Sequence, residues 1–236
     1  PEAVLTGVDI SSYGRREMSL GSLVEKILDE VPELKRLRLS TIDPAAVDDD
    51  LIEVIAANDR LMPHIHLSLQ SMDATILKRM GRRHRPEDVF DLCRRIRGIR
   101  PDTAFGADLI AGFPTEDDEM FERTLCCVDS LGLTYLHVFP FSRRPGTPAA
   151  KMPPAAPGAA KARAARLRQV GRETLDRFLR AKIGAEVEVL CEDGNLGHCR
   201  DYAQVRLVRP ARPGQLVAAR VIGVEDGRLI AEEAGT

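Results

Sequence analysis

Five apolar, strand-like runs recur along the first 142 residues at a spacing of about thirty residues, and each run ends in polar or small residues. The runs are Ala3–Ile10, Leu34–Ile42, His64–Gln70, Thr103–Phe113 and Tyr135–Ser142. A parallel strand, its crossover helix and the next strand need about thirty residues or more. The pattern therefore predicts consecutive βα units of an α/β domain, arranged as part of a βα barrel.

Helix-like spacing of apolar residues fills the gaps between these runs. Ser19 and Asp48–Asp50 stand just before apolar positions, where acceptors and negative charge meet free backbone N–H groups. Pro86, followed by two acidic residues, is typical of a first helical turn. The predicted helices are Ser19–Glu30, Asp48–Asn58, Asp73–Met80, Pro86–Gly98 and Glu116–Leu131.

Polar residues mark the ends of the predicted strands. In βα barrels the chemistry takes place at the carboxyl ends of the strands, because the loops that carry functional residues gather there. We therefore expect a functional site on that rim. Its candidate residues are Thr6, Asp9, Ser40, Thr41, Ser68, Gln70, Asp108 and Ser142.

The alternation of strand and helix stops at Arg143–Pro157, where five prolines in fifteen residues exclude a helix or a central strand. Gly158–Lys182 then predicts a basic, Ala-rich helix. The predicted domains are a partial βα barrel (1–142), a Pro-rich linker with the basic helix (143–182) and a small β-barrel (183–236). The short alternating runs that predict the last domain are Ala185–Leu190, Ala203–Val208, Gln215–Val224 and Arg228–Ala231.

The composition is that of a soluble, intracellular chain. Its 236 residues are 44% hydrophobic, and none of the apolar runs approaches the roughly eighteen residues that span a membrane. Five cysteines without a regular framework favour a reducing, cytoplasmic setting. The chain begins at Pro1 inside an apolar run and shows no signal peptide. We therefore expect it to be a fragment whose natural start lies upstream.

Basic residues concentrate in two blocks, although the net charge is only −2. Arg143–Lys182 contains eleven Lys or Arg and two acidic residues, and Lys78–Arg100 contains nine and three. A solvated helix face is the usual explanation of a single charged run. Two basic blocks near one predicted rim instead favour a polyanionic partner such as a nucleic acid.

No pattern of acid–base or nucleophilic catalysis is evident, because the spacings of zinc proteases, serine hydrolases and P-loops are absent. His64 and His66 alternate with apolar residues, and we expect them to be hydrogen-bonded histidines of the barrel wall. No three cysteines are spaced to hold an iron–sulfur cluster. Cys191, His198 and Cys199 lack a fourth ligand for zinc. The sequence therefore predicts no catalytic residue and no metal site.

Five strings fall in register with the predicted strand ends. They are LTGVDISSYG (Leu5–Gly14), HLSLQS (His66–Ser71), LKRMGRRH (Leu77–His84), DLIAGFPTE (Asp108–Glu116) and FPFSRRPGTPA (Phe139–Ala149). In this order they closely resemble the radical-SAM methylthiotransferases of the MiaB/MtaB/RimO family, and above all its MtaB-type branch. The resemblance runs through essentially the whole chain.

The resemblance implies an open radical-SAM βα barrel that binds S-adenosylmethionine against a [4Fe–4S] cluster. This chain resembles units two to six of the family's six-unit barrel, and Ile183–Glu232 resembles its RNA-binding TRAM β-barrel. The first unit, whose three cysteines hold the cluster, and the N-terminal domain with a second cluster have no counterpart in this sequence. We therefore expect the missing cluster domain of the same polypeptide as a partner, and the fragment alone to be inactive.

The resemblance also implies which residues contact the cofactor. Short polar side chains and exposed strand-end backbone suit the ammonium, carboxylate, ribose and adenine of S-adenosylmethionine, and glycines allow the backbone to approach closely. The predicted contacts are Thr6, Gly7 and Asp9 for the amino group, Ser68 and Gln70 for ribose or carboxylate, Arg82 for carboxylate or phosphate, and Ile110, Gly112, Phe139 and Pro140 for adenine.

RNA contacts are predicted in the basic region and in the small β-barrel, through phosphate pairing and base stacking. The barrel itself, Ile183–Thr236, has six Arg and nine acidic residues, so most of the charge should come from Arg143–Lys182. The predicted RNA contacts are Arg143, Arg144, Arg166, Arg200 and Tyr202.

Three positions depart from the family pattern. Met72 and Thr115 stand where the family usually has Gly, which bears on the conformation of two loops. In the barrel hairpin, Gly197–Tyr202 (GHCRDY) replaces the usual Gly-x-Thr-x-Asn-Tyr.

The function that the resemblance implies is methylthiolation of tRNA. Reductive cleavage of S-adenosylmethionine would give a radical that abstracts hydrogen from C2 of a modified adenosine beside the anticodon, where a methylthio group is then added. For the MtaB-type branch this nucleoside is threonylcarbamoyladenosine. The alternatives are isopentenyladenosine in tRNA or an aspartate of a ribosomal protein as the substrate. In a different class, the chain would be a non-catalytic RNA-binding module.

Overall fold

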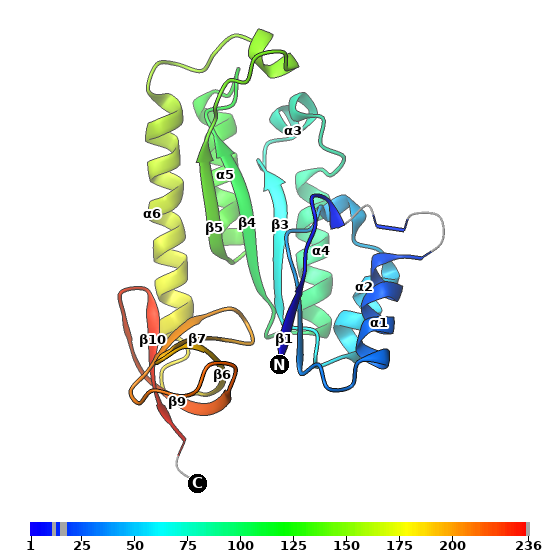
Figure 1. Ribbon diagram of the computed structural model, residues 1–236. Helices are drawn as coiled ribbons and strands as arrows, with labels where there is room; N and C mark the ends of the chain where they lie inside the picture. The colour runs from blue at the N-terminus through cyan, green and yellow to red at the C-terminus, as the bar shows by residue number, and fades with distance from the viewer. Residues whose placement is uncertain (11–12, 15–17, 235–236) are drawn as a thin grey trace.

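The computed structural model describes residues 1–10, 13–14 and 18–234, so Ser11 and Ser12 of the first sequence string lie outside the described residues. Strands and helices alternate through the first 140 residues, as the apolar pattern predicts (Figure 1). Their order is β1 (Glu2–Leu5), α1 (Leu20–Glu30), β2 (Arg36–Leu39), the 3₁₀ turn η2 (Pro44–Ala46), α2 (Asp49–Ala57), β3 (His64–Gln70), α3 (Ala74–Met80), α4 (Pro86–Ile99), β4 (Ala104–Ala111), α5 (Asp118–Ser130) and β5 (Leu133–Pro140).

The strands of this α/β part are parallel. β1 pairs with β2, and β3, β4 and β5 form a second sheet. Isolated bridges from Leu37 to Leu61 and from Ile42 to Leu67 connect the two. In Figure 1, α4 and α5 lie behind the strands, and a later helix, α6 (Ala159–Arg180), runs alongside β5. The carboxyl ends of β3, β4 and β5 consequently meet at one end of the molecule.

Local sequence explains the helices. Ser19, Asp48, Asp73 and Asp117 precede α1, α2, α3 and α5, and each side chain accepts a backbone N–H of the first turn. The helices then bury aliphatic faces in one core with the sheet. Among the strands that are shorter than predicted, β1 ends early at Leu5 and β2 at Leu39. The polar or small residues that follow them, which disfavour strands, stand on the rim instead.

The Pro-rich segment runs from the end of β5 to α6 (Ala159–Arg180). The prolines predict neither a helix nor a central strand here, and the segment departs from this at one short 3₁₀ turn, η3 (Pro148–Lys151). Thr147 accepts the backbone N–H of Ala150 and so caps the turn. The segment is anchored to the loop after β4, because the N–H of Thr115 donates to the carbonyl oxygen of Pro153 at 3.1 Å.

The C-terminal region is a closed five-stranded barrel with the strand order β10-β8-β7-β6-β9. The short alternating runs predict four of these strands but not β7, because Gly197 breaks its apolar alternation. A Cβ at Gly197 would lie 2.1 Å from the carbonyl oxygen of Leu190, so the strand pairing requires glycine there. The strands are β6 (Glu186–Asp193), β7 (Leu196–Cys199), β8 (Gln204–Leu207), β9 (Leu216–Glu225) and β10 (Arg228–Glu233).

The small barrel docks on β1 and β2 through buried charges. Nη2 of Arg36 donates to Oε1 of Glu188 at 2.8 Å, and Nη1 of Arg38 donates to the carbonyl oxygen of Arg200 at 3.1 Å. Nε2 of His198 lies 3.0 Å from Oε1 of Glu2. Among the described residues, no helix has both the length and the apolar character needed to cross a bilayer.

Candidate functional site

The end of β3 is strained. Between Leu67 and Gln70, three steps along β3 pair with two steps along β4, so the register shifts. Gln70 then adopts a left-handed backbone with φ of 67°, which residues with side chains rarely adopt. Its Nε2 donates to Oγ of Ser68 at 2.9 Å. Bulges and strained residues concentrate at functional sites, where they re-aim side chains.

Arg82 joins this group from the loop after α3. Gly81 ends α3 in the left-handed conformation, and Arg82 then donates from Nη2 to the carbonyl oxygen of Ser68 at 2.7 Å. The same Nη2 lies 3.5 Å from Oδ2 of Asp43. Burial alone would raise the pKa of Asp43, but the N–H of Ala45 and the guanidinium of Arg82 hold it below its usual value. The predicted residues Ser68, Gln70 and Arg82 are thus linked by hydrogen bonds.

Glu116 holds the loop that follows β4. Its Oε2 accepts the N–H of Gly112 at 2.8 Å and a guanidinium hydrogen of Arg163 at 2.8 Å. Burial raises the pKa of Glu116 despite these contacts. Gly112 has φ of 75°, and a Cβ there would lie 2.4 Å from Ala160 of α6. Only glycine fits this close approach of loop and helix.

Thr115 and Met72, which stand where the family usually has Gly, differ in backbone conformation. Thr115 adopts φ of 68°, a conformation that suits the usual Gly and strains a β-branched residue. Met72 avoids the left-handed region, is only 3% exposed, and donates its N–H to Oγ1 of Thr124 at 3.0 Å. Met72 therefore replaces Gly without backbone strain.

A pocket of about 420 Å³ opens at the carboxyl ends of β3, β4 and β5, which we call the cofactor pocket. Arg144, from the segment after β5, also lines it. Phe139 is 52% exposed and presents an aromatic ring beside strand-end backbone. Four predicted cofactor contacts line this pocket: Gln70, Ile110, Phe139 and Pro140.

The other six predicted cofactor contacts lie outside the lining of this pocket. Ser68 and Arg82 support Gln70 through the hydrogen bonds described above. Gly112 lines a neighbouring pocket of about 430 Å³. Three exposed residues follow β1 and do not line the cofactor pocket: Thr6, Gly7 and Asp9.

The residues of the cofactor pocket fit S-adenosylmethionine. Phe139 and Ile110 offer apolar surface for adenine, and the Gln70 amide can donate to a ribose or carboxylate oxygen. The Arg144 guanidinium is suited to a carboxylate. When bound and reduced by an iron–sulfur cluster, this cofactor supplies radical chemistry.

The five cysteines do not fit an iron–sulfur cluster. All are free, and they lie apart on α4, α5, β6 and β7. Burial raises the pKa of Cys93 and of Cys127 to about 11 and that of Cys199 to about 12, which opposes the thiolate form that binds iron. No three cysteines come together as ligands in the part of the chain that the structure describes.

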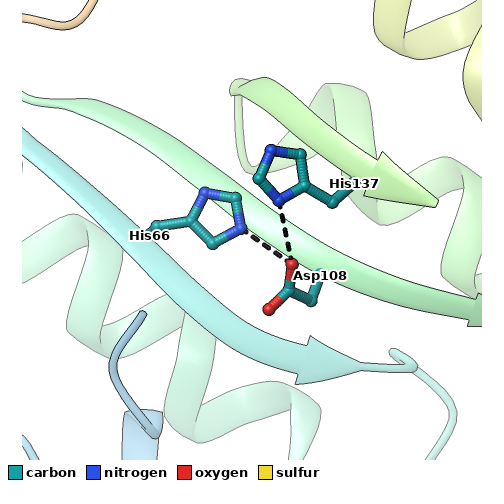
Figure 2. A group of neighbouring side chains, drawn as sticks. All are labelled: His66, Asp108 and His137. Carbon is teal, nitrogen blue, oxygen red and sulfur yellow. Dashed lines mark hydrogen bonds and ion pairs between the residues drawn. The ribbon is translucent and has the colours of Figure 1, made fainter. Parts of the chain in front are cut away.

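Figure 2 shows His66 of β3, Asp108 of β4 and His137 of β5, whose side chains meet. Nε2 of His66 lies 3.1 Å, and Nδ1 of His137 lies 3.2 Å, from Oδ1 of Asp108. Burial alone would raise the pKa of Asp108, but hydrogen bonds from the two rings hold it below its usual value. The carboxylate therefore accepts, and each ring donates. One possible metal-ligand atom from each of the three side chains lies within 4.8 Å of the other two, close enough to bind one divalent cation.

Sequence reasoning did not anticipate this cluster. It placed Asp108 on the rim and His66 in the barrel wall but did not single out His137. The available signal was a lone titratable residue in the apolar run Tyr135–Ser142. That signal identifies His137 alone. The contact of its side chain with those of His66 and Asp108 depends on the register of three strands.

His64 corrects the expectation that both wall histidines are hydrogen-bonded. It is 6% exposed, and neither ring nitrogen has a hydrogen-bond partner among the described residues. The ring instead stacks on Tyr202, with centroids 4.8 Å apart, and meets Tyr135 edge-on at 5.3 Å. Burial, followed by the charge of Arg38, lowers the pKa of His64 to about 3. The expectation is correct for His66 and wrong for His64.

The predicted RNA contacts of the basic region lie near the carboxyl ends of the strands and on α6. Arg143 donates from Nη2 to the carbonyl oxygen of Met152 at 3.5 Å, next to Arg144. Arg166 binds Glu122 through both terminal nitrogens, at 2.5 and 3.2 Å. Glu122 therefore neutralises the charge of Arg166, which leaves Arg143 and Arg144 as the more available cations.

Arg200 and Tyr202 lie at the opposite end of the strands, between the small barrel and the α/β part. Nη2 of Arg200 donates to the carbonyl oxygen of Asp59 at 2.6 Å. Tyr202 packs on His64, and the guanidinium carbon of Arg38 lies 4.9 Å from the centre of its ring. Both residues thus contribute to the docking of the barrel, while Tyr202 remains 45% exposed.

Comparison with known proteins finds relatives in sequence and in fold. The Radical SAM superfamily model matches residues 2–126. Threonylcarbamoyladenosine tRNA methylthiotransferase MtaB of Rickettsia prowazekii (strain Madrid E) is 47% identical over 231 residues, which cover 97% of this chain and 55% of that protein. The tRNA-2-methylthio-N(6)-dimethylallyladenosine synthase of Cereibacter sphaeroides (strain ATCC 17025 / ATH 2.4.3) is 36% identical over 241 residues, covering 99% and 55%. The chain spans about half the length of these relatives.

Two solved structures are similar in fold. Coproporphyrinogen III oxidase (HemN) from Escherichia coli, a radical SAM enzyme, gives a TM-score of 0.52 at 16% identity, covering 86% of this chain and 51% of that one. The radical S-adenosylmethionine methyltransferase TsrM from Kitasatospora setae gives 0.50 at 18% identity, covering 62% and 28%. At these identities the likeness concerns the fold alone. The Radical SAM superfamily model matches more than half of the residues of this chain, and the chain therefore belongs to the radical SAM superfamily.

Proposed function

We propose that this chain is the cofactor- and tRNA-binding part of a methylthiotransferase that modifies an adenosine beside the anticodon of tRNA. One observation carries the proposal. Gln70, Ile110, Phe139 and Pro140 converge on one pocket at the strand ends, in a chain whose sequence matches a tRNA methylthiotransferase along 97% of its length. That pocket lies where βα barrels carry their chemistry.

Within this proposal, S-adenosylmethionine occupies the cofactor pocket. Gln70 and Arg144 bind its ribose and carboxylate, and Phe139 with Pro140 holds its adenine. Thr6, Gly7 and Asp9 would reach its amino group, as the family resemblance implies. The [4Fe–4S] cluster is held by cysteines of the same polypeptide outside this chain. The coverage of about half of each relative supports this division.

The small closed barrel is proposed as a TRAM-like RNA-binding domain. Its five-stranded closure is compatible with that role. The cation Arg143 lines the pocket beside the cofactor pocket, where a phosphate of the anticodon loop would lie when the target base is bound.

Threonylcarbamoyladenosine is the proposed substrate, because the relative named for it shares 47% identity with this chain. A relative named for dimethylallyladenosine shares 36%, which keeps that nucleoside as the second candidate. Analysis of the tRNA product separates the two.

The test is to express the full-length parent anaerobically in a strain that lacks the modification and to analyse tRNA nucleosides by mass spectrometry. The wild type should produce 2-methylthio-threonylcarbamoyladenosine. Gln70→Ala should reduce the product at least about tenfold, because it removes a hydrogen bond to the cofactor. Gln169→Ala is the matched control, since Gln169 is exposed on α6 and bonds only Glu173. Unmodified tRNA despite cofactor cleavage would exclude the tRNA substrate, and a methylthio-dimethylallyl product would exclude the threonylcarbamoyl assignment.

A further inference from the structure

A second cavity, of about 640 Å³, lies between the strands of the α/β part, helix α6 and the small barrel, and we call it the interior cavity. β5 contributes Thr134–His137 to it and Phe139–Pro140 to the cofactor pocket, so the two are neighbours along one strand. Strands β1, β2 and β3, helix α6 and the small barrel supply the other walls. A molecule in the interior cavity would therefore lie next to a cofactor in the pocket.

The lining of the interior cavity is one-sided in charge. It contains three arginines and three histidines but no Asp or Glu. Arg38 is bound to Glu2 at 3.0 Å, and Nη2 of Arg168 donates to the carbonyl oxygen of Val138 at 3.2 Å. Arg172 has no hydrogen-bond or ion-pair partner among the described residues. The cavity thus presents a cation that no protein group balances.

The position of Arg172 follows from one face of α6. Arg168, Gly171, Arg172 and Leu175 all line the cavity, with the three- and four-residue spacing of a single helix face. A Cβ at Gly171 would lie 3.0 Å from Cδ1 of Leu136, so glycine allows this face to approach β5. Arg168 and Arg172 are like charges four residues apart, an arrangement that destabilises a helix unless an anion relieves it.

His137 adds a directed polar group to the same cavity. Its Nδ1 donates to Asp108, which fixes the ring and the tautomer (Figure 2). Its Nε2 remains available to accept a hydrogen bond. The cavity thus combines guanidinium donors, suited to a carboxylate, with an imidazole acceptor, suited to a neighbouring hydroxyl.

We propose, building on the function proposed above, that Arg172, assisted by Arg168, binds the carboxylate of the substrate's threonylcarbamoyl group and that His137 accepts a hydrogen bond from its hydroxyl, so that this subsite selects that group. That group ends in a carboxylate and a hydroxyl, whereas a dimethylallyl group has neither. A guanidinium binds a carboxylate through two parallel hydrogen bonds. With the carboxylate in this subsite, the adenine extends along β5 toward the cofactor pocket.

The test measures binding of nucleosides to the 236-residue chain by titration calorimetry. The probes are N6-threonylcarbamoyladenosine, its methyl ester and N6-dimethylallyladenosine. The free acid should bind at least about tenfold more tightly than the ester, because the ester lacks a charge-assisted hydrogen bond. Arg172→Gln should reduce affinity for the acid by about tenfold and leave the ester unchanged, and Arg172→Lys should fall between the two. Arg180→Gln is the control, because Arg180 is exposed on the same helix and pairs with Asp176.

Equal affinity of the wild type for acid and ester, no binding of the acid, or an acid-to-ester ratio that Arg172→Gln leaves unchanged would overturn the subsite. The ratio is internal to each variant, so partial unfolding does not imitate the expected result. Its failure is also distinct from failure of the proposed function. Methylthiolation of tRNA by the full-length parent can persist if the carboxylate binds elsewhere, and nucleoside binding can persist without methylthiolation.

Discussion

Gln70, Thr115 and Tyr202 adopt left-handed backbone conformations although each carries a full side chain. Gln70 lines the cofactor pocket, Thr115 follows the loop of Gly112, and Tyr202 lines the interior cavity. Such conformations cost about 1–3 kcal/mol each and persist only where their surroundings impose them. Of the four described non-glycine residues with this backbone, Gln70 and Tyr202 therefore line the two proposed binding regions, whereas Asp226 lies in the turn between β9 and β10.

Thr115→Gly should raise the free energy of unfolding by about 0.5–1 kcal/mol. Relief of the strained β-branched residue outweighs the added entropy of glycine in the unfolded chain and the loss of the exposed Arg79 hydrogen bond. Urea denaturation measures the change. Thr147→Gly is the control, because Thr147 has φ of −83° and caps η3. That variant should lose stability, so a loss of similar size at both sites would contradict the strain argument.

At the scale of the element, the spacing of apolar residues predicted which segments form helices and strands. The helices of the α/β part bury one face, and β2, β3 and β4 bury most of their residues on both faces, so helical spacing and apolar runs were both visible in the sequence. Element ends were less predictable, as the early end of β1 shows. The cofactor pocket was partly predictable, because Gln70, Ile110, Phe139 and Pro140 belong to motif strings. The interior cavity was not, because His137 and Arg172 are distant in sequence and meet only through the packing of α6 on β5.

Two helical glycines should respond in opposite ways to alanine. A Cβ at Gly98 of α4 meets nothing within 4 Å, so Gly98→Ala should raise the free energy of unfolding by about 0.5–1 kcal/mol through helix propensity. Gly171→Ala should gain nothing or lose stability, because its Cβ would press on Leu136. Thermal unfolding of the two variants makes the comparison. Equal stabilisation at both sites would show that α6 does not depend on its close approach to β5.

At the scale of the whole molecule, one buried carboxylate joins the first strand to the small barrel. Glu2 contacts Arg38 at 3.0 Å and His198 at 3.0 Å, and it lies 3.7 Å from Arg36. Burial alone would raise its pKa, but the hydrogen bonds from His198 and Arg38 lower it to about 2. The sequence could not reveal this network, since its members are nearly two hundred residues apart and meet only when the barrel docks.

Glu2→Gln should lower the free energy of unfolding by about 3 kcal/mol at pH 7. Because the pKa of Glu2 is about 2 in the folded protein and the ordinary value for a glutamate is 4.5, the stabilisation is complete above about pH 4.5 and is lost as the pH falls toward 2. Urea denaturation at several pH values should therefore show a difference between wild type and variant that shrinks below pH 4.5. Glu30→Gln, at an exposed pair with Lys26, should change stability by less than about 1 kcal/mol at every pH. A pH-independent difference for Glu2→Gln would contradict the assignment.

Helix α6 contributes to both hydrophobic cores, with Leu167 in that of the α/β part and Leu179 in that of the small barrel. The length of α6 therefore sets both the distance and the rotation between the two cores. Each residue inserted between these two leucines would advance the barrel by about 1.5 Å and turn it by about 100°. A single insertion would rotate Glu188 and His198 away from Arg36 and Glu2, whereas seven residues, close to two turns, would nearly restore their direction but displace the barrel by about 10 Å. Length changes that related chains tolerate should therefore fall outside this stretch of α6.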